Sequence, residues 1–216
     1  MEYFKKLFVV AGVMARERFS ERKKQSISFS TLLLLVCLAW PTLGRSEGRV
    51  IDVAHSTLTV YVYKTGFLSP LAHNHEIEAP IEWGEVKDTG SSSVELRVRA
   101  NTLRVSDAEV SDDTRAKIQE TLRSAQVLDV DHFPEIHFQS AQVEARGTDH
   151  WIVHGNLDLH GQRHPVSVDV ALKDGLYRGT ATLKQTQFGI TPVRLAGGTV
   201  KVKDEIKVDF SIALVK

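Results

Sequence analysis

Residues 127–140 read VLDVDHFPEIHFQS, and this stretch decides the fold class. The ring of Pro134 crowds the residue before it out of helical backbone, so we expect His132–Phe133 to be extended. Beyond the proline, apolar and polar residues alternate through residues 135–140, which is strand spacing. The stretch therefore predicts a corner where a helical segment ends and a long antiparallel sheet begins.

The same alternation continues on both sides of this corner. In residues 94–101, 165–173 and 205–215, apolar side chains occupy every second position, which predicts strands with one buried face and one wet face. Short Gly-containing turns separate neighbouring runs and suit tight hairpins. We predict an all-β fold, a closed up-and-down barrel of about eight strands, at residues 50–64, 74–87, 94–101, 135–146, 151–160, 165–173, 176–188 and 205–215.

One helix is expected to interrupt the strands. Ser111 is a good N-cap residue, and Asp112 and Asp113 suit the positive end of a helix dipole. Ile118 and Leu122 are four residues apart and form an apolar stripe. We expect this short helix to lie across the barrel.

The N-terminal region reads as a targeting segment. Ile27–Trp40 is an apolar run that follows several basic residues and precedes Pro41–Gly44, a pattern typical of a secretory signal peptide. We predict a signal peptide at 1–44 and one domain at 45–216, exported to the bacterial periplasm or beyond. The rival reading is an uncleaved anchor, although the apolar run is shorter than the roughly 20 residues that a span needs.

Charge and cysteine content exclude several classes of protein. The chain has 27 basic and 27 acidic residues. Removal of residues 1–44 leaves 20 basic and 24 acidic residues, so we expect no nucleic-acid partner and no polybasic membrane patch. Because the apolar run is removed with this segment, we expect no stable membrane span in the mature chain. The single cysteine, Cys37, lies inside the apolar run. The mature domain is thus predicted to use no disulfide, thiol chemistry or cysteine-based zinc site.

Five motifs follow one another after residue 48. They are Ile51-Asp52 with His55-Ser56, Val127-Leu128-Asp129, Phe133–Ser140, Gly155–Gly161 with Val166-Ser167-Val168, and Phe188-Gly189-Ile190. In the order and spacing of these motifs, the region resembles the YceI-like family of bacterial lipid-binding (polyisoprenoid-binding) proteins. The resemblance implies an extended, lipocalin-like antiparallel barrel whose apolar lumen holds a long isoprenoid chain, in a protein that is exported.

The chain departs from the commoner family pattern after the first strand. Where other members carry a His-rich, Gly-containing segment, this chain has Lys64–Pro70 and then Leu71–His75. These residues mark it as a divergent subgroup with a His-Asn-His segment. The difference bears on the identity of the ligand more than on the fold.

His73 and His75 are the sharpest local feature. Strand parity places both imidazoles on the apolar side. Three interpretations stay open: they stabilise the barrel mouth, they contact a ligand head group, or they bind a metal. A metal needs a third ligand, for which His55 is the best candidate and His132 the next.

The lumen of the expected barrel is predicted to bind the ligand. An eight-stranded barrel can be packed solid or can hold one small ligand, and Trp83, Phe133, Phe138 and Phe188 could line a tunnel or fill a core. The resemblance favours a tunnel. We predict a ligand-binding set of Leu58, Val60, Val62, His73, His75, Ile77, Ile81, Trp83, Leu96, Val98, Phe138 and Phe210.

We therefore predict a binding protein that sequesters or carries an isoprenoid or other long-chain lipid, without a cofactor. No nucleophile motif surrounds His55-Ser56 and adjacent strand residues face opposite ways, so we expect no enzyme. The alternatives are a metal-binding protein or metal-dependent enzyme using His55, His73 and His75, and a ligand-free envelope interaction domain. The sequence leaves a homodimer open.

Overall fold

The computed structural model describes residues 48–65, 74–87, 92–195 and 200–215. The predicted signal peptide and His73 lie outside the described residues. The described part belongs to one compact unit of the chain, Arg45–Lys216.

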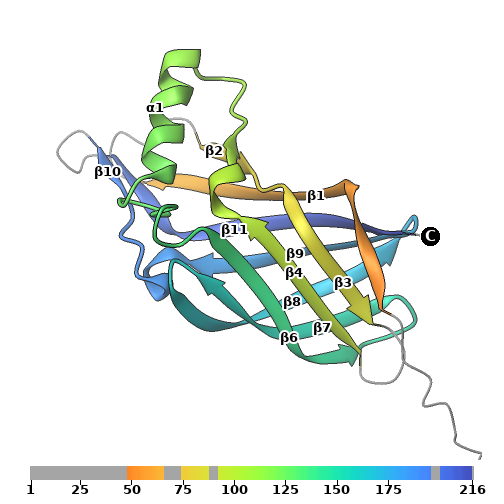
Figure 1. Cartoon of the computed structure of the whole chain (residues 1–216). Helices are drawn as coiled ribbons and strands as arrows, with labels where there is room; N and C mark the ends of the chain where they lie inside the picture. Colours follow the sequence, from red (N-terminus) through yellow and green to blue (C-terminus); the bar gives the residue numbers. More distant parts are fainter. Residues whose placement is uncertain (1–47, 66–73, 88–91, 196–199, 216) are drawn as a thin grey trace, which may run out of the picture. The chain divides into compact units, whose positions relative to one another are not determined.

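Eight antiparallel strands form a closed ring (Figure 1). Each strand pairs with the next, and β11 pairs with β1 to close the barrel. In ring order they are β1 (Arg49–Thr65), β3 (Ile81–Lys87), β4 (Ser93–Arg99), β6 (Glu135–Ala145), β7 (His150–Leu159), β8 (Gln162–Lys173), β9 (Leu176–Lys184) and β11 (Val200–Leu214).

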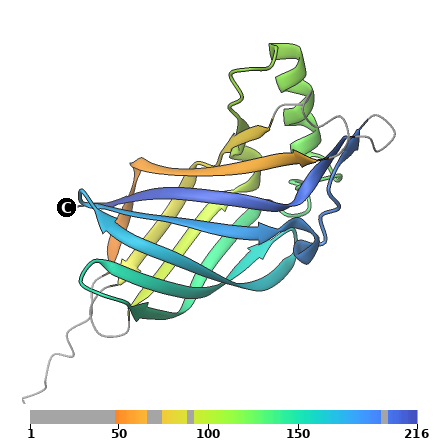
Figure 2. The same cartoon turned by 180° about the vertical axis from the view of Figure 1, so that it is seen from behind.

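Three short strands extend the sheet at one end of the barrel. β2 (His75–Glu78) pairs with the second half of β1, and β5 (Arg104–Val105) pairs with β2. β10 (Arg194–Leu195) pairs with β11. The 3-10 helices η3 (Ala100–Thr102) and η4 (Gln185–Phe188) and the α-helix α1 (Asp112–Arg123) lie at the same end, as the view from behind in Figure 2 shows for α1.

The predicted all-β barrel with one short helix is confirmed, with two corrections to its strands. The expected strand at 74–87 is two strands. The pairing of β2 with β1 ends with the bond from the Ala79 N–H to the Leu58 carbonyl (2.9 Å), because Pro80 has no N–H to continue it. The expected strand at 176–188 ends at Lys184, where η4 begins.

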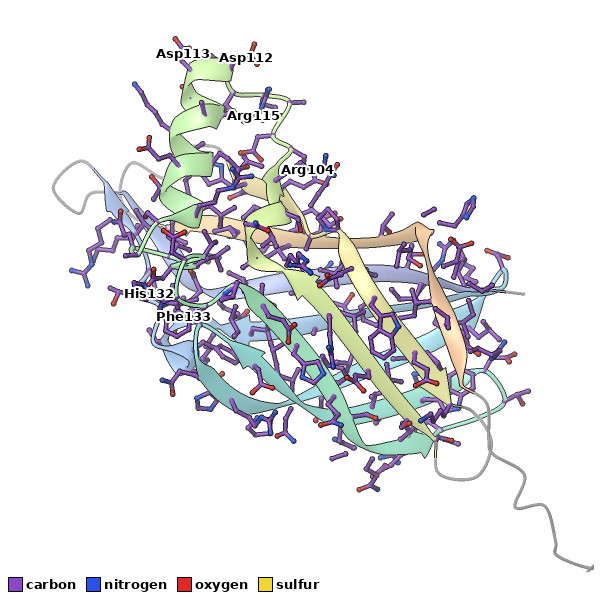
Figure 3. All side chains as sticks on the ribbon, viewed as in Figure 1. Arg104, Asp112, Asp113, Arg115, His132 and Phe133 are labelled. Carbon is purple, nitrogen blue, oxygen red and sulfur yellow. The ribbon has the colours of Figure 1, made fainter. Side chains whose placement is uncertain are left out.

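The helix begins as its sequence predicts. Ser111 is the N-cap, and its hydroxyl accepts the Thr114 N–H. Figure 3 shows the first turn, with Asp112 and Asp113 at its tip and Arg115 just below. Leu122 is buried, whereas the opposite face is exposed.

The corner at 127–140 differs from its prediction at one residue. Asp129 has a positive φ of 46°, and its carbonyl accepts the His132 and Phe133 N–H groups (3.0 and 2.8 Å). His132 therefore lies in a turn, and the expectation that it is extended was wrong. The physical reason is that Pro134 restricts only the residue directly before it. Strand geometry begins at Glu135, as expected.

Two hairpins are as tight as their glycines suggest. His160 and Gly161 join β7 to β8 with φ values of 50° and 69°, and Asp174 and Gly175 join β8 to β9 with 55° and 76°. Two consecutive positive φ values suit the right-handed twist of the flanking strands. Within the residues that the structure covers, no helix is both long and apolar enough to cross a bilayer.

Candidate functional site

The barrel encloses an apolar cavity of about 400 Å³. This volume falls in the range of roughly 300–1,000 Å³ that ligand pockets occupy. Inward-facing side chains of all eight ring strands line it, and the segment between β4 and β6 adds Leu103, Leu122, Val127 and Leu128. The lumen is therefore not packed solid.

The cavity is closed at the end where α1 lies. Leu122 and Leu128 come from the helix and the turn that follows it, whereas Phe188 and Ile190 come from η4 and the residues after it. All four side chains are buried, and Phe188 is only 1% exposed. These residues form an apolar floor.

The opposite end, where β6 joins β7 and β8 joins β9, is open. Here Val86, Val94, Trp151 and Tyr177 line the cavity but are only half-buried. Ser92, which also lines the cavity, is exposed, so solvent reaches the lumen from this end. We call this the hairpin mouth.

Two glycines in the wall make room for aromatic rings. A Cβ on Gly155 would meet the Phe138 ring at 2.5 Å, and a Cβ on Gly179 would meet the Phe210 ring at the same distance. Phe210 and Gly179 are direct cross-strand partners. Each ring thus lies against its neighbouring strand, which leaves the middle of the lumen empty.

Most of the predicted ligand-binding residues face this cavity. Their role in binding stays a prediction. Those that line it are Leu58, Val60, Val62, Ile77, Leu96, Val98, Phe138 and Phe210. Ile81 does not line the cavity but is buried in a cluster with Ile51 and Ile212, which do line it.

The expectation that Trp83 points into the lumen was wrong. The pairing of β3 with β4 shifts between Ile81 and Trp83, which is a β-bulge. One extra residue inverts the alternation that follows it. Trp83 is 36% exposed, and the Arg97 guanidinium lies 5.5 Å from its ring centroid on the outer face.

His75 faces inward as its strand parity predicts, but its side chain contacts the Asp107 carboxylate and does not line the cavity. Its Nδ1 donates to the Asp107 carboxylate at 2.5 Å, and the two side chains are 12% and 5% exposed. Asp107 also accepts the Glu76 N–H (2.6 Å). Burial lowers the pKa of the nearby Lys64 ammonium, and the charge of Asp107 offsets part of that shift. His73 lies outside the described residues.

The proposed metal set is not brought together. His75 pairs in register with Val62, seven residues along β1 from His55, which is about 23 Å at strand rise. His55 and His132 are each 77% exposed and bonded to a local aspartate, Asp52 and Asp129. Among the described residues, no group of three His, Cys, Asp or Glu side chains is placed to hold a metal ion.

A polar network on the outer face fixes neighbouring strands. His137 lies between Glu95 (3.0 Å) and Asp158 (3.5 Å), and Arg163 donates two bonds to Asp158. Burial raises the pKa of Glu95, but bonds from Arg97 and His137 outweigh it and hold the pKa below its usual value. The Arg163 bonds likewise lower the pKa of Asp158.

The sequence analysis missed two leucines that line the cavity, Leu103 and Leu128, and the two wall glycines. Leu103 and Leu128 lie in irregular segments, where periodicity gives no signal of direction. Gly155 and Gly179 each sit alone inside an alternating strand, which is the usual sign of a close approach. That signal was present in the sequence.

A closed antiparallel barrel with an apolar floor, an open mouth and an apolar cavity has a lipocalin-like architecture. Residues 50–214 match the YceI-like domain family, and the chain belongs to that family. The resemblance noted from the sequence is thereby confirmed.

Relatives and solved structures agree with this assignment. A UPF0312 protein of Shewanella baltica is 27% identical over 180 residues, which cover 78% of this chain and 88% of the relative. A second, from Vibrio cholerae, is 22% identical over 188 residues, covering 82% and 93%.

Among solved structures, Burkholderia cenocepacia BcnA superposes with a TM-score of 0.61 at 16% identity, covering 77% of this chain and 99% of its own. A polyisoprenoid binding domain from Saccharophagus degradans, implicated in plant cell wall breakdown, has a TM-score of 0.51 at 15% identity, covering 77% and 97%. At these low sequence identities, the structural similarity establishes only that this chain shares the fold of the two proteins.

Proposed function

We propose that this protein binds the long apolar chain of an isoprenoid-type lipid in its lumen. The observation that carries the proposal is the apolar cavity, open at the hairpin mouth and closed by the floor under α1. Burial of an apolar chain there contributes about 25 cal/mol for each Å² removed from water. The name of the Saccharophagus degradans domain, a polyisoprenoid binding domain, supports this choice of ligand.

The proposed activity is sequestration or carriage, without chemistry on the ligand. Away from the mouth, Gln185 is the one polar side chain among the described residues that line the cavity. Its amide donates to the Lys203 carbonyl (2.8 Å) and is thereby engaged in structure. A chain deep in this lumen would meet hydrocarbon walls.

Export is part of the same proposal. The basic, apolar and small-residue pattern of residues 1–44 supports removal of a signal peptide and a periplasmic location. N-terminal sequencing of protein recovered from the periplasm tests this point. A new N-terminus near residue 45 is expected. Retention of Ile27–Trp40 in a membrane fraction would favour the anchor instead.

Native mass spectrometry of the full chain, purified from an exporting bacterial host, tests the ligand. We expect a fraction of the protein to carry a non-covalent mass, and organic extraction to release it as a prenyl lipid. Unloaded protein should then take up geranylgeraniol in a titration. If extraction yields nothing and geranylgeraniol does not bind, the lipid-binding proposal fails and the ligand-free interaction domain replaces it.

A further inference from the structure

A second pocket lies outside the floor of the cavity, at the end of the barrel that carries α1 and β10 (Figure 1). Its volume is about 430 Å³, within the range of roughly 300–1,000 Å³ that small-molecule pockets occupy. It is lined by Ala125 and Gln126 after α1, by His160 in the β7–β8 hairpin and by residues 189–194 after η4. Ile190 lines both this pocket and the cavity, so the floor is the wall between them.

The polar side chains of this second pocket include no carboxylate among the described residues. They are those of Gln126, His160, Thr191 and Arg194. The His160 Nδ1 donates to the Phe188 carbonyl (3.0 Å), and its ring meets the Phe133 ring edge-on at 4.7 Å between centroids. These contacts fix the imidazole and leave its Nε2 for a ligand. The lining is therefore rich in hydrogen-bond donors and carries positive charge at Arg194.

A second cation stands beside Arg194. Arg194 on β10 is the direct cross-strand partner of Lys201 on β11, and both side chains are exposed. Cross-strand partners project to the same face of a sheet, and like charges placed in this way destabilise the pairing. Within the part of the chain that the structure describes, neither cation has a carboxylate partner. An anion held between the two would remove their repulsion.

We propose that this second pocket binds a small organic anion from solution, a phosphate monoester or a carboxylate, with its oxyanion at Arg194 and Lys201. Charge-assisted bonds to an oxyanion are stronger than bonds between neutral groups, and a guanidinium offers two parallel N–H groups to one. Ala125, Pro192 and Val193 give the body of such a ligand an apolar surface. This site is separate from the lumen and does not depend on a lipid being bound there.

Phenyl phosphate and benzoate are suitable probes, because each joins an anion to an apolar ring small enough for the pocket. Titration calorimetry of the purified protein at pH 7 and low salt measures their dissociation constants. At least one probe should bind with a dissociation constant of about 1 mM or tighter, and the binding should weaken as salt is added. The probe that binds more tightly identifies the class of anion.

The double variant Arg194→Gln with Lys201→Gln tests the cation pair. It should weaken binding of the preferred probe at least about tenfold, while the melting temperature without ligand does not fall, because a repulsive pair is removed. Arg194→Gln alone serves if the double variant does not fold. Lys173→Gln is the matched control, since this exposed lysine ends β8, about 35 Å along the strand from the hairpin that carries His160.

The variant Ala125→Trp tests the pocket itself, because it fills the space for the ring and leaves both cations in place. It should abolish binding of the preferred probe. Ala116→Trp places the same side chain at an exposed position on α1 that does not line the pocket, and it should bind like the wild type. All of these variants should still bind geranylgeraniol, whose proposed place is the lumen.

Three results would overturn the second site. One is that neither probe binds the wild-type protein at 10 times the expected dissociation constant, about 10 mM. Another is that binding survives both the double charge substitution and Ala125→Trp. The third is that vesicles of phosphatidylcholine with phosphatidic acid bind the protein while both soluble probes do not, which would assign the cations to a membrane surface. Loss of geranylgeraniol binding by the wild type would instead count only against the lumen proposal.

Discussion

Asp107 and His75 form a buried pair that fastens the helix-bearing segment to the barrel wall. Their 2.5 Å contact is joined by the Glu76 N–H, which donates to the other carboxylate oxygen. On the helix side, Arg115 donates from Nε to the Asp107 carbonyl (3.0 Å). Because residues from this segment form the cavity floor, the pair holds the floor in place.

The substitution Asp107→Asn should loosen this attachment. One carboxylate oxygen becomes an amide nitrogen, which donates rather than accepts, so either the His75 Nδ1–H or the Glu76 N–H loses its charged acceptor. We expect the free energy of unfolding to fall by about 1.5–3 kcal/mol, as for bonds to a buried charge. Urea denaturation measures it. Asp113→Asn, on the exposed first turn of α1, is the control, and an equal effect of the two variants would argue against a fastening role.

Gly179 should tolerate no side chain. An added Cβ would lie 2.3 Å from the Asp169 carbonyl oxygen and 2.5 Å from the Phe210 ring, and the backbone oxygen cannot move aside. We expect Gly179→Ala to cost about 1–3 kcal/mol of stability by overpacking and to push the ring toward the lumen. Gly147→Ala is the matched control, because nothing lies within 4 Å of its Cβ position. Thermal unfolding of both variants checks this, and identical melting temperatures would contradict it.

The barrel could be predicted from sequence because its strands are long and each keeps one apolar face. Val60, Val98 and Phe210 all point inward as their parity indicates. Alternation is a direct consequence of pleating, so it carries side-chain direction without any knowledge of tertiary structure.

The direction of side chains could not be predicted where the backbone departs from the regular pleat. The bulge before Trp83 and the break at Ala79-Pro80 each reset the register of the wall. The pairing of Asp107 with His75 could not be predicted from the sequence. Asp107 lies in an irregular segment, 32 residues from His75, and the two side chains meet only in the folded chain. The floor and its fastening thus depend on long-range contacts that periodicity does not encode.

We expect the free energy of unfolding to decrease at acidic pH because of two carboxylates on the outer face, Glu95 and Asp158. Glu95 and Asp158 have folded pKa values below their ordinary 4.5 and 3.8. A depressed folded pKa adds stability above the ordinary pKa, and this contribution is lost as the pH falls through the folded value. Both side chains are about one-third exposed, so screening limits each to roughly 0.2–1 kcal/mol.

The variant Glu95→Gln isolates this effect. Its deficit in unfolding free energy relative to the wild type should be present at pH 7. The deficit should shrink as the pH falls below 4.5 and through the lower folded pKa of Glu95, where the folded wild-type carboxylate takes up its proton. Urea denaturation across pH 2.5–7 measures the deficit. Glu120→Gln, at an exposed position on α1, should show none. A deficit that does not change with pH would mean that packing, rather than charge, is lost.

Filling the lumen should block the ligand without unfolding the barrel. Val60 on β1 lines the cavity and is only half-buried, whereas its neighbour Thr59 faces outward and pairs with Glu78 and Asp209. We expect Val60→Trp to place its indole in empty space, so the melting temperature should change little while geranylgeraniol binding is lost. Thr59→Trp adds the same side chain on the opposite face and should keep wild-type binding.

The melting temperature decides how a loss of binding by Val60→Trp is to be understood. If the lumen were packed, the indole would overpack it and cost about 1–3 kcal/mol, and binding would fall because the fold is damaged. Loss of binding at an unchanged melting temperature, with Thr59→Trp unaffected, follows only if the ligand and the indole compete for the same cavity. A Val60→Trp protein that still binds geranylgeraniol as tightly as the wild type would place the lipid outside the lumen.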